Sequence, residues 1–261
     1  MKRRALLSAL IIVCLAGCAS LPPGAKPDPH DRFERFNRGV YKFNDALDRG
    51  VARPVAKAYV KVTPRPIRTG VSNFLANLGS PLTIVNDLLQ GKIKGFGTDT
   101  ARLVVNTTIG IGGLFDPASK MGLQAGDEDF GQTLGKWGVH SGPYLVLPLL
   151  GPSTVRDGFG KVADQFAQPR SYINDPYVRY GLTALDLVNT RAGLLQTDDT
   201  LRRAFDPYAF VRNAWLQRRQ FQVYDGNPPE EPEPEEPDED DAGAAPAAPA
   251  APAAPAAPAK D

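Results

Sequence analysis

The sequence predicts an all-α domain followed by a disordered C-terminal tail. Three observations support this prediction. Apolar residues recur at helical spacing in successive segments that Gly and Pro separate. Hairpin signals do not recur at strand spacing, and no internal repeat is evident. The composition of the 261-residue chain also changes abruptly at both ends.

The first 18 residues carry the pattern of a lipoprotein signal. Lys2-Arg3-Arg4 precede an apolar segment from Ala5 to Val13, which is shorter than the roughly 20 residues that span a bilayer. Leu15-Ala16-Gly17-Cys18 resembles a lipobox. We therefore expect residues 1–17 to be cleaved, Cys18 to be lipidated, and residues 18–30 to form a lipidated tether. Because Asp does not follow Cys18, sorting to the outer membrane is favoured. The alternative is an ordinary signal with a chance cysteine.

The other end of the chain is acidic and rich in Pro and Ala. A Pro-broken acidic run over 230–241 precedes Ala-Ala-Pro repeats. These residues have almost nothing to bury, so residues 226–261 are expected to form a disordered tail. A solubilising role is the simpler interpretation. A tether to the cell wall or to a basic partner is the alternative.

The predicted helices follow one another from residue 33. The first carries a stripe with spacings of three and four residues, formed by Phe33, Phe36, Val40, Phe43 and Leu47. Pro54 and Pro66 suit the first turns of the second and third helices. Ser80-Pro81 predicts a further helix start, and Thr98 or Asp99 predicts an N-cap. Later helices are expected over 154–166, 175–195 and 198–224, with a break or kink at Asp206-Pro207 in the last one.

Two long uncharged stretches do not fit an ordinary soluble helical protein. They are Leu103–Phe115 and Trp137–Val155, and the second contains three prolines that would break a spanning helix. Irregular backbone survives at membrane depth only where protein or water covers it. The second stretch therefore predicts a Gly/Pro-rich re-entrant or interfacial hairpin. A buried loop in a soluble core is the alternative.

The sequence offers little support for catalysis or metal binding. His140 and Ser141 are adjacent and lack the surrounding elbow of a serine hydrolase. The run from Asp127 to Asp129 lacks the spacing of a calcium loop and fits the first turn of a helix better. Gly110, Gly112 and Gly113 give only a fragment of a dinucleotide motif. We expect no enzyme activity, no cofactor and no metal.

Charge and cysteine content further restrict the class of protein to which the chain can belong. Residues 18–225 hold 26 Lys and Arg against 19 Asp and Glu. This net charge of +7 suits an anionic surface but is not the dense basic field of a nucleic-acid binder. Both cysteines lie in the first 18 residues, which excludes a disulfide framework in the body.

Motifs spread over about 195 residues resemble the VacJ/MlaA family of outer-membrane lipoproteins. They run through the whole body, in the segments 31–38, 41–44, 53–56, 72–74, 77–78, 89–91, 106–113, 115–116, 130–139, 142–144, 147–148, 190–192, 206–208 and 217–219. The resemblance implies that residues 31–225 form a ring-like helical domain in the inner leaflet of the outer membrane. The acidic tail has no counterpart in the family core.

The resemblance also implies a function. Family members provide an amphipathic channel that removes mislocalised phospholipids from the outer leaflet and so maintains lipid asymmetry. They work with a trimeric porin and pass lipid to a soluble periplasmic carrier, which feeds an inner-membrane ABC transporter. No cofactor is implied. The channel or lipid path is expected to involve Phe43, Asn44, Gly131, Gly135, Trp137, Gly138, Gly142, Pro143, Tyr144 and Pro148.

Simpler roles stay open for several of these residues. Each glycine is equally well explained by tight packing, Phe43 by a core position and Asn44 by a helix surface. Two other functions also remain: a structural lipoprotein whose tail bridges the outer membrane and the cell wall, and a lipid-modifying hydrolase that uses His140.

Overall fold

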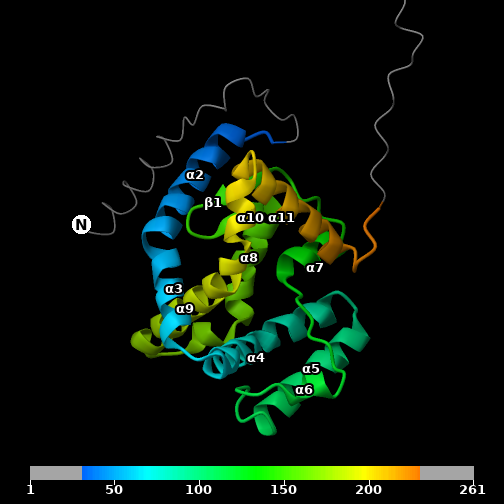
Figure 1. Cartoon of the computed structure of the whole chain (residues 1–261). Helices are drawn as coiled ribbons and strands as arrows, with labels where there is room; N and C mark the ends of the chain where they lie inside the picture. Colours follow the sequence, from blue (N-terminus) through cyan, green and yellow to red (C-terminus); the bar gives the residue numbers. More distant parts are fainter. Residues whose placement is uncertain (1–30, 230–261) are drawn as a thin grey trace, which may run out of the picture. The chain divides into compact units, whose positions relative to one another are not determined.

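The computed structural model describes residues 31–229, most of which are helical (Figure 1). The signal peptide expected at 1–17, the lipidated Cys18, the tether at 18–30 and the tail after residue 229 lie outside the described residues. Within 31–229, no helix has the length and apolar character needed to cross a bilayer. The mostly helical class predicted from the sequence is confirmed.

The first described helices form a continuous segment. Helix α2 (Glu34–Leu47) runs through a π-helical turn (Asp48–Ala52) into α3 (Arg53–Val62). Pro54 is the second residue of α3, close to the start that the sequence predicts. The wider turn ends two residues before this proline, which has no backbone N–H to continue the regular ladder.

Helix α4 (Arg65–Leu89) differs from its prediction. The sequence predicts a new helix at Ser80-Pro81, but α4 continues through Pro81. The Ser80 hydroxyl donates to the carbonyl of Ala76 (3.1 Å) beside the point where the proline interrupts the ladder. Because α4 packs along α5 (Ile93–Thr108), tertiary contact favours one long helix over two short ones.

The start of α5 was also predicted wrongly. The helix begins at Ile93, so Thr98 and Asp99 lie inside it and do not cap it. The turn between α4 and α5 contains Gly91, whose φ of +73° suits glycine, and this turn sets the earlier start. The Asp99 carboxylate is buried and accepts a hydrogen bond from the backbone N–H of Gly126 (3.1 Å).

The predicted hairpin is present as two short strands between helices. Helices α6 (Pro117–Lys120) and α7 (Phe130–Lys136) precede strands β1 (Tyr144–Leu147) and β2 (Gly151–Thr154). The strands pair antiparallel, with Tyr144 opposite Thr154 and Leu147 opposite Gly151. This small sheet lies inside the Pro-broken stretch and is the one departure from an all-α description in the described part of the chain.

The C-terminal helices follow the predicted order. They are α8 (Val155–Ala167), α9 (Pro176–Gly193), α10 (Asp198–Arg203) and α11 (Pro207–Val223). Asp206 caps α11 by accepting from the N–H groups of Tyr208 and Ala209, which confirms the predicted break. Helix α7 packs against α8 and α11, α3 packs against α9, and α2 packs against β1.

The distribution of side chains between inside and outside is unusual. Among the described residues, seven apolar residues are buried, against eighteen polar or charged ones. The apolar cluster consists of Val40, Tyr144, Val146 and Tyr208. Many large apolar side chains are instead exposed, among them Phe159, Phe166 and Phe205.

Candidate functional site

The β-hairpin is held by two asparagines of α2 that lie seven residues apart. Asn37 donates from Nδ2 to the carbonyl of Tyr144 (3.0 Å) and accepts from the N–H of Val146 (2.8 Å). Asn44 repeats the arrangement at the hairpin tip: it donates to the carbonyl of Leu147 (3.0 Å) and accepts from the N–H of Leu149 (2.8 Å). Seven residues make two helical turns, so both amides lie on the same face of α2. The two side-chain amides pair with backbone carbonyl and N–H groups of the hairpin, as the backbone of a neighbouring strand would.

The base of the hairpin is anchored in a polar cluster. Asn37 is fully buried and also donates to Asp31 (2.9 Å). The hydroxyl of Tyr208 donates to the same carboxylate, and the guanidinium of Arg38 lies over the Tyr208 ring. Arg38 in turn binds the Asp206 carboxylate at 2.6 Å. The N-cap of α11, the start of α2 and the hairpin are therefore connected.

The hairpin tip is apolar and exposed. Leu149 and Leu150 expose 73% and 66% of their surface, and Leu149 has a φ of +66°, which is unusual for a residue other than glycine. The N–H of Leu149 is the group that Asn44 binds. The asparagine therefore compensates for the left-handed conformation of the tip.

An apolar groove of about 670 Å³ lies between the hairpin and α8. The hairpin contributes Leu145, Leu147 and Leu150, and α8 contributes apolar residues that include Phe159 and Phe166. Two titratable groups, Lys161 and Asp164, line the same groove. It therefore combines the apolar wall and the few charges that suit an amphipathic ligand.

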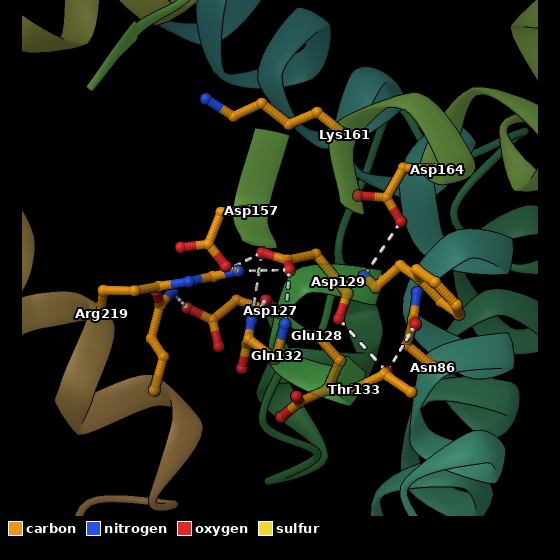
Figure 2. A network of polar contacts seen from close by, with 12 residues as sticks. Asn86, Asp127, Glu128, Asp129, Gln132, Thr133, Asp157, Lys161, Asp164 and Arg219 are labelled. Carbon is orange, nitrogen blue, oxygen red and sulfur yellow. Dashed lines mark hydrogen bonds and ion pairs between the residues drawn. The ribbon is translucent and has the colours of Figure 1, made fainter. Parts of the chain in front are cut away.

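A network of buried charges joins α7, α8 and α11 (Figure 2). Arg219 of α11 binds the Asp129 carboxylate at 2.6 and 2.7 Å and Asp157 at 2.8 Å. Burial would raise the pKa of Asp129 and of Asp157, but hydrogen bonds and charge from Arg219 lower both. Asp129 also caps α7 by accepting from the N–H of Gln132 (2.9 Å). This assigns it the helix-start role predicted for the acidic run.

Two other titratable groups flank this network. Asp164 accepts from the N–H of Phe130 (3.0 Å), and burial raises its pKa to about 6. Burial lowers the pKa of Lys161, whose ammonium donates to the carbonyl of Pro152 (3.1 Å). Lys161 and Asp164 lie three residues apart on α8, and Figure 2 shows their side chains pointing in different directions.

The structure divides the predicted glycines into two groups. A Cβ on Gly131 would lie 2.4 Å from Arg219 and 2.5 Å from Asp157, and one on Gly135 would lie 2.7 Å from Arg156. Close packing against the charge network therefore accounts for Gly131 and Gly135. Gly138 and Gly142 have φ values of +87° and +67°, which accounts for them as turn residues. A role of any of the four in a lipid path stays a prediction.

The remaining predicted residues surround the hairpin. Tyr144 is buried in the apolar cluster, whereas Pro143 and Pro148 flank β1 and are partly buried. The indole of Trp137 is 54% exposed and donates to the carbonyl of Leu89 (3.0 Å). Phe43 is 37% exposed on α2, next to the Asn44 contact. Asn44 and Tyr144 are thus brought together at one hairpin, while Gly131 and Gly135 pack against the charged side chains of α8 and α11.

A second hollow follows the other uncharged stretch. It has a volume of about 1070 Å³ and lies between the start of α4 and the loop after α5. Ile67, Ile109 and Phe115 line it and are all more than half exposed. Arg65 and Lys120 contribute cations to the lining. The uncharged stretch Leu103–Phe115 thus ends in an apolar surface with basic residues beside it.

The residues considered for other chemistry do not assemble into a site. The Nδ1 atom of His140 accepts from the N–H of Gly142 (3.0 Å), while the Ser141 hydroxyl faces the carbonyl of Gly142. Neither bond joins the histidine to the serine. Within residues 31–229, no group of three or more His, Cys, Asp and Glu residues is placed to hold a metal ion.

Sequence reasoning missed the roles of three residues. Asn37 lies in the segment 31–38 that resembles the family, and its spacing of seven residues from Asn44 is a signal that could have linked the two asparagines. Arg219 lies 90 residues from Asp129 and 62 from Asp157, so no local pattern could have joined them. Lys161 is an isolated lysine in a helix, and only its packing distinguishes it.

These features define a mostly helical protein that buries polar groups and presents apolar surface, a partition suited to contact with lipid. The family model for the MlaA lipoprotein matches residues 29–222, and the chain belongs to this family. The "Intermembrane phospholipid transport system lipoprotein MlaA" of Escherichia coli (strain K12) is 40% identical over 238 residues, covering 88% of this chain and 93% of that protein. The protein of the same description from Haemophilus influenzae is 36% identical over 235 residues, covering 87% and 93%.

A solved structure supports the same assignment. It comes from "Structural basis for maintenance of bacterial outer membrane lipid asymmetry", and its chain is 38% identical to this one. The match covers 74% of this chain and 98% of that chain, with a TM-score of 0.67. Sequence and fold therefore agree on the family that the motifs indicated.

Proposed function

We propose that this chain is an outer-membrane lipoprotein that removes mislocalised phospholipid from the outer leaflet and thereby maintains lipid asymmetry. The relatives described as parts of an intermembrane phospholipid transport system support the transport role. The structural neighbour from work on outer-membrane lipid asymmetry supports the location. Membership in the MlaA lipoprotein family, together with these relatives, supports a transport role over an enzymatic one.

The observation that carries the proposal is the inverted distribution of side chains. Phe159, Phe166 and Phe205 expose 71%, 73% and 105% of their reference surface, while charged residues such as Asp157 and Arg219 are buried. Each large apolar side chain left in water forgoes roughly 1.5–3 kcal/mol of burial free energy. Acyl chains would cover these side chains without that cost. Because no described helix can span a bilayer, insertion into a single leaflet fits both observations.

The hairpin and its groove are the proposed path for lipid. A phospholipid needs an apolar wall for its acyl chains and polar groups for its headgroup. The groove between the hairpin and α8 supplies both, with Leu147, Phe159 and Lys161 in its lining. Leu150 of the hairpin tip lines the groove, and Asn44 binds the adjacent Leu149. We propose that Phe43, Asn44 and the loop before β1, which contains Gly138 and Gly142, border the lipid path.

The chain needs partners to give transport a direction. A passive path shifts lipid only as the difference in free energy between the two ends dictates. We propose that a soluble periplasmic carrier takes the lipid and feeds an inner-membrane ABC transporter, and that a trimeric porin holds the chain in the outer membrane. Lipidation at Cys18, outside the described residues, would anchor it at the periplasmic face, since multiple acyl chains bind stably to a bilayer.

The test is the amount of phospholipid on the surface of intact cells, measured with an impermeant reagent that labels headgroup amines. Deletion of the gene should raise the labelling, and the wild-type gene on a plasmid should restore it. A Cys18→Ser variant should be released from the membrane and fail to restore it. Unchanged labelling after deletion, in cells whose envelope is otherwise damaged, would refute the transport role and favour a structural tether.

A further inference from the structure

Lys161 lines two hollows of opposite character. One is the apolar groove of about 670 Å³ beside the hairpin, which Leu147, Leu150 and Phe159 help to form. The other is a polar pocket of about 250 Å³ whose lining includes Asp157 and Arg219. Among the described residues, Lys161 is the one that both linings share. A ligand with one apolar end and one charged end could occupy both and contact this lysine between them.

Within the described part of the chain, the ammonium of Lys161 forms no ion pair at contact distance, and Asp157 and Asp129 act on it only at longer range. The ammonium donates a hydrogen bond to a neutral acceptor, the carbonyl of Pro152 (3.1 Å). Asp129 and Asp157, the carboxylates that line the polar pocket, both bind Arg219 at 2.6–2.8 Å. Asp164 accepts from the backbone of Phe130 and points in a different direction (Figure 2).

This arrangement leaves a partly buried cation with unused donors. An ammonium has three N–H groups, and one of them reaches Pro152. Burial lowers the pKa of Lys161 because it disfavours the charged form. An anion beside Lys161, the residue that lines both hollows, would both accept the free donors and compensate the charge.

We propose that Lys161 binds the phosphate of a phospholipid whose acyl chains lie in the groove between the hairpin and α8. The inference rests on the proposed function and adds the residue that recognises the headgroup. The charged side chains that line the polar pocket are Asp129, Asp157, Lys161, Arg218 and Arg219, and their formal charges sum to +1. An anionic phosphate therefore enters this pocket without a net electrostatic conflict.

The test is the binding of soluble short-chain ligands to the full-length protein held in an amphipol, measured by calorimetry. The probes are dihexanoyl phosphatidylcholine below its micelle concentration, dihexanoylglycerol, which lacks the phosphate, and inorganic phosphate. The variants are Lys161→Gln and Lys161→Arg. The matched control is Lys57→Gln, which changes an exposed lysine of α3. Thermal melts identify any variant that has lost its fold.

Lys161→Gln should weaken binding of the phosphatidylcholine about tenfold, the loss expected for one charge-assisted hydrogen bond. Its affinity for dihexanoylglycerol should not change, because the apolar groove is intact. Lys161→Arg keeps the charge and should retain most of the affinity, and Lys57→Gln should match the wild type. A purely structural role for Lys161 would instead weaken both lipids together.

Three results would overturn the inference. One is equal affinity of wild type and Lys161→Gln for the phosphatidylcholine, in which case the proposed function stands without this contact. Another is competition by inorganic phosphate at the same concentration as the lipid, because the groove would then contribute nothing. The third is a wild-type protein that binds neither lipid, which would refute the proposed function as well.

Discussion

Replacement of Asn44 by alanine should loosen the tip of the hairpin while leaving its base in place. The substitution removes two hydrogen bonds, one to the carbonyl of Leu147 (3.0 Å) and one from the N–H of Leu149 (2.8 Å). Each is worth about 1 kcal/mol net. Because the tip is partly exposed, water can satisfy the freed groups, so the local loss should be about 1–2 kcal/mol.

Amide hydrogen exchange measures this loss at the two reporter positions. Exchange at Leu149 should accelerate about tenfold, since about 1.4 kcal/mol corresponds to a factor of ten. Exchange at Val146 should not change, because its N–H is bound by the intact Asn37 (2.8 Å). Lys42→Ala, an exposed position on the same helix, is the control and should alter neither rate.

The contrast with Asn37 makes the reasoning refutable. Asn37 is fully buried and makes three hydrogen bonds, to Asp31, Tyr144 and Val146. Its replacement by alanine leaves buried groups without partners, so the whole fold should lose about 3 kcal/mol or more. Unchanged protection of Leu149 in Asn44→Ala, or equal global destabilisation by the two substitutions, would show that the asparagines do not hold the hairpin.

Three further substitutions test the charge network and its packing by denaturant unfolding. Arg219→Met should lower the free energy of unfolding by about 3–5 kcal/mol, because it leaves buried carboxylates unpaired. Arg218→Met, at an exposed position, should lower it by under about 1 kcal/mol. Equal losses in the two variants would contradict the network. Asp164→Asn should stabilise the fold by about 2 kcal/mol near pH 8 and by less than half of that near pH 4.5. The sign follows because the raised pKa of about 6 makes the wild-type carboxyl stabilising only when protonated; a pH-independent effect would refute this. Gly131→Ala should cost about 1–3 kcal/mol through overlap with Arg219, while Gly181→Ala, in open space on α9, should stabilise by about 0.5–1 kcal/mol; equal effects would contradict the close packing.

The pH dependence of the network has the opposite sign to that of Asp164. Arg219 lowers the pKa of Asp129 and of Asp157 in the folded protein. Their contribution is therefore present above the ordinary carboxyl pKa of about 3.9 and is lost as the pH falls through the lower folded values. A fall in pH should therefore weaken this network, whereas at Asp164 it should remove a destabilising buried charge.

The sequence predicted most helices because their signals are local. Pro54, Pro207 and the capping residue Asp206 mark helix starts through the chemistry of single residues, and the structure has α3 and α11 begin there. Pro81 misled the same reasoning. A proline favours a helix start only until packing along a neighbouring helix outweighs the loss of one hydrogen bond, and α4 and α5 pack in this way.

The site was predictable only in part, for a physical reason. The Pro-broken stretch around Tyr144 and Pro148 indicated a hairpin, and the hairpin is present. Its attachment to Asn37 and Asn44 and the packing of Gly131 against Arg219 join residues about 90–110 positions apart. Such contacts depend on tertiary packing, which periodicity and motif spacing do not encode.

The transport of phospholipid out of the outer leaflet can be followed directly in cells. Outer-leaflet phospholipid is tagged on intact cells with an impermeant amine reagent, and the inner and outer membranes are separated after a chase. Tagged lipid should reach the inner membrane in wild-type cells and in deletion cells that carry the gene on a plasmid, and it should stay in the outer membrane of the deletion strain. Equal arrival of tagged lipid with and without the gene would contradict the account.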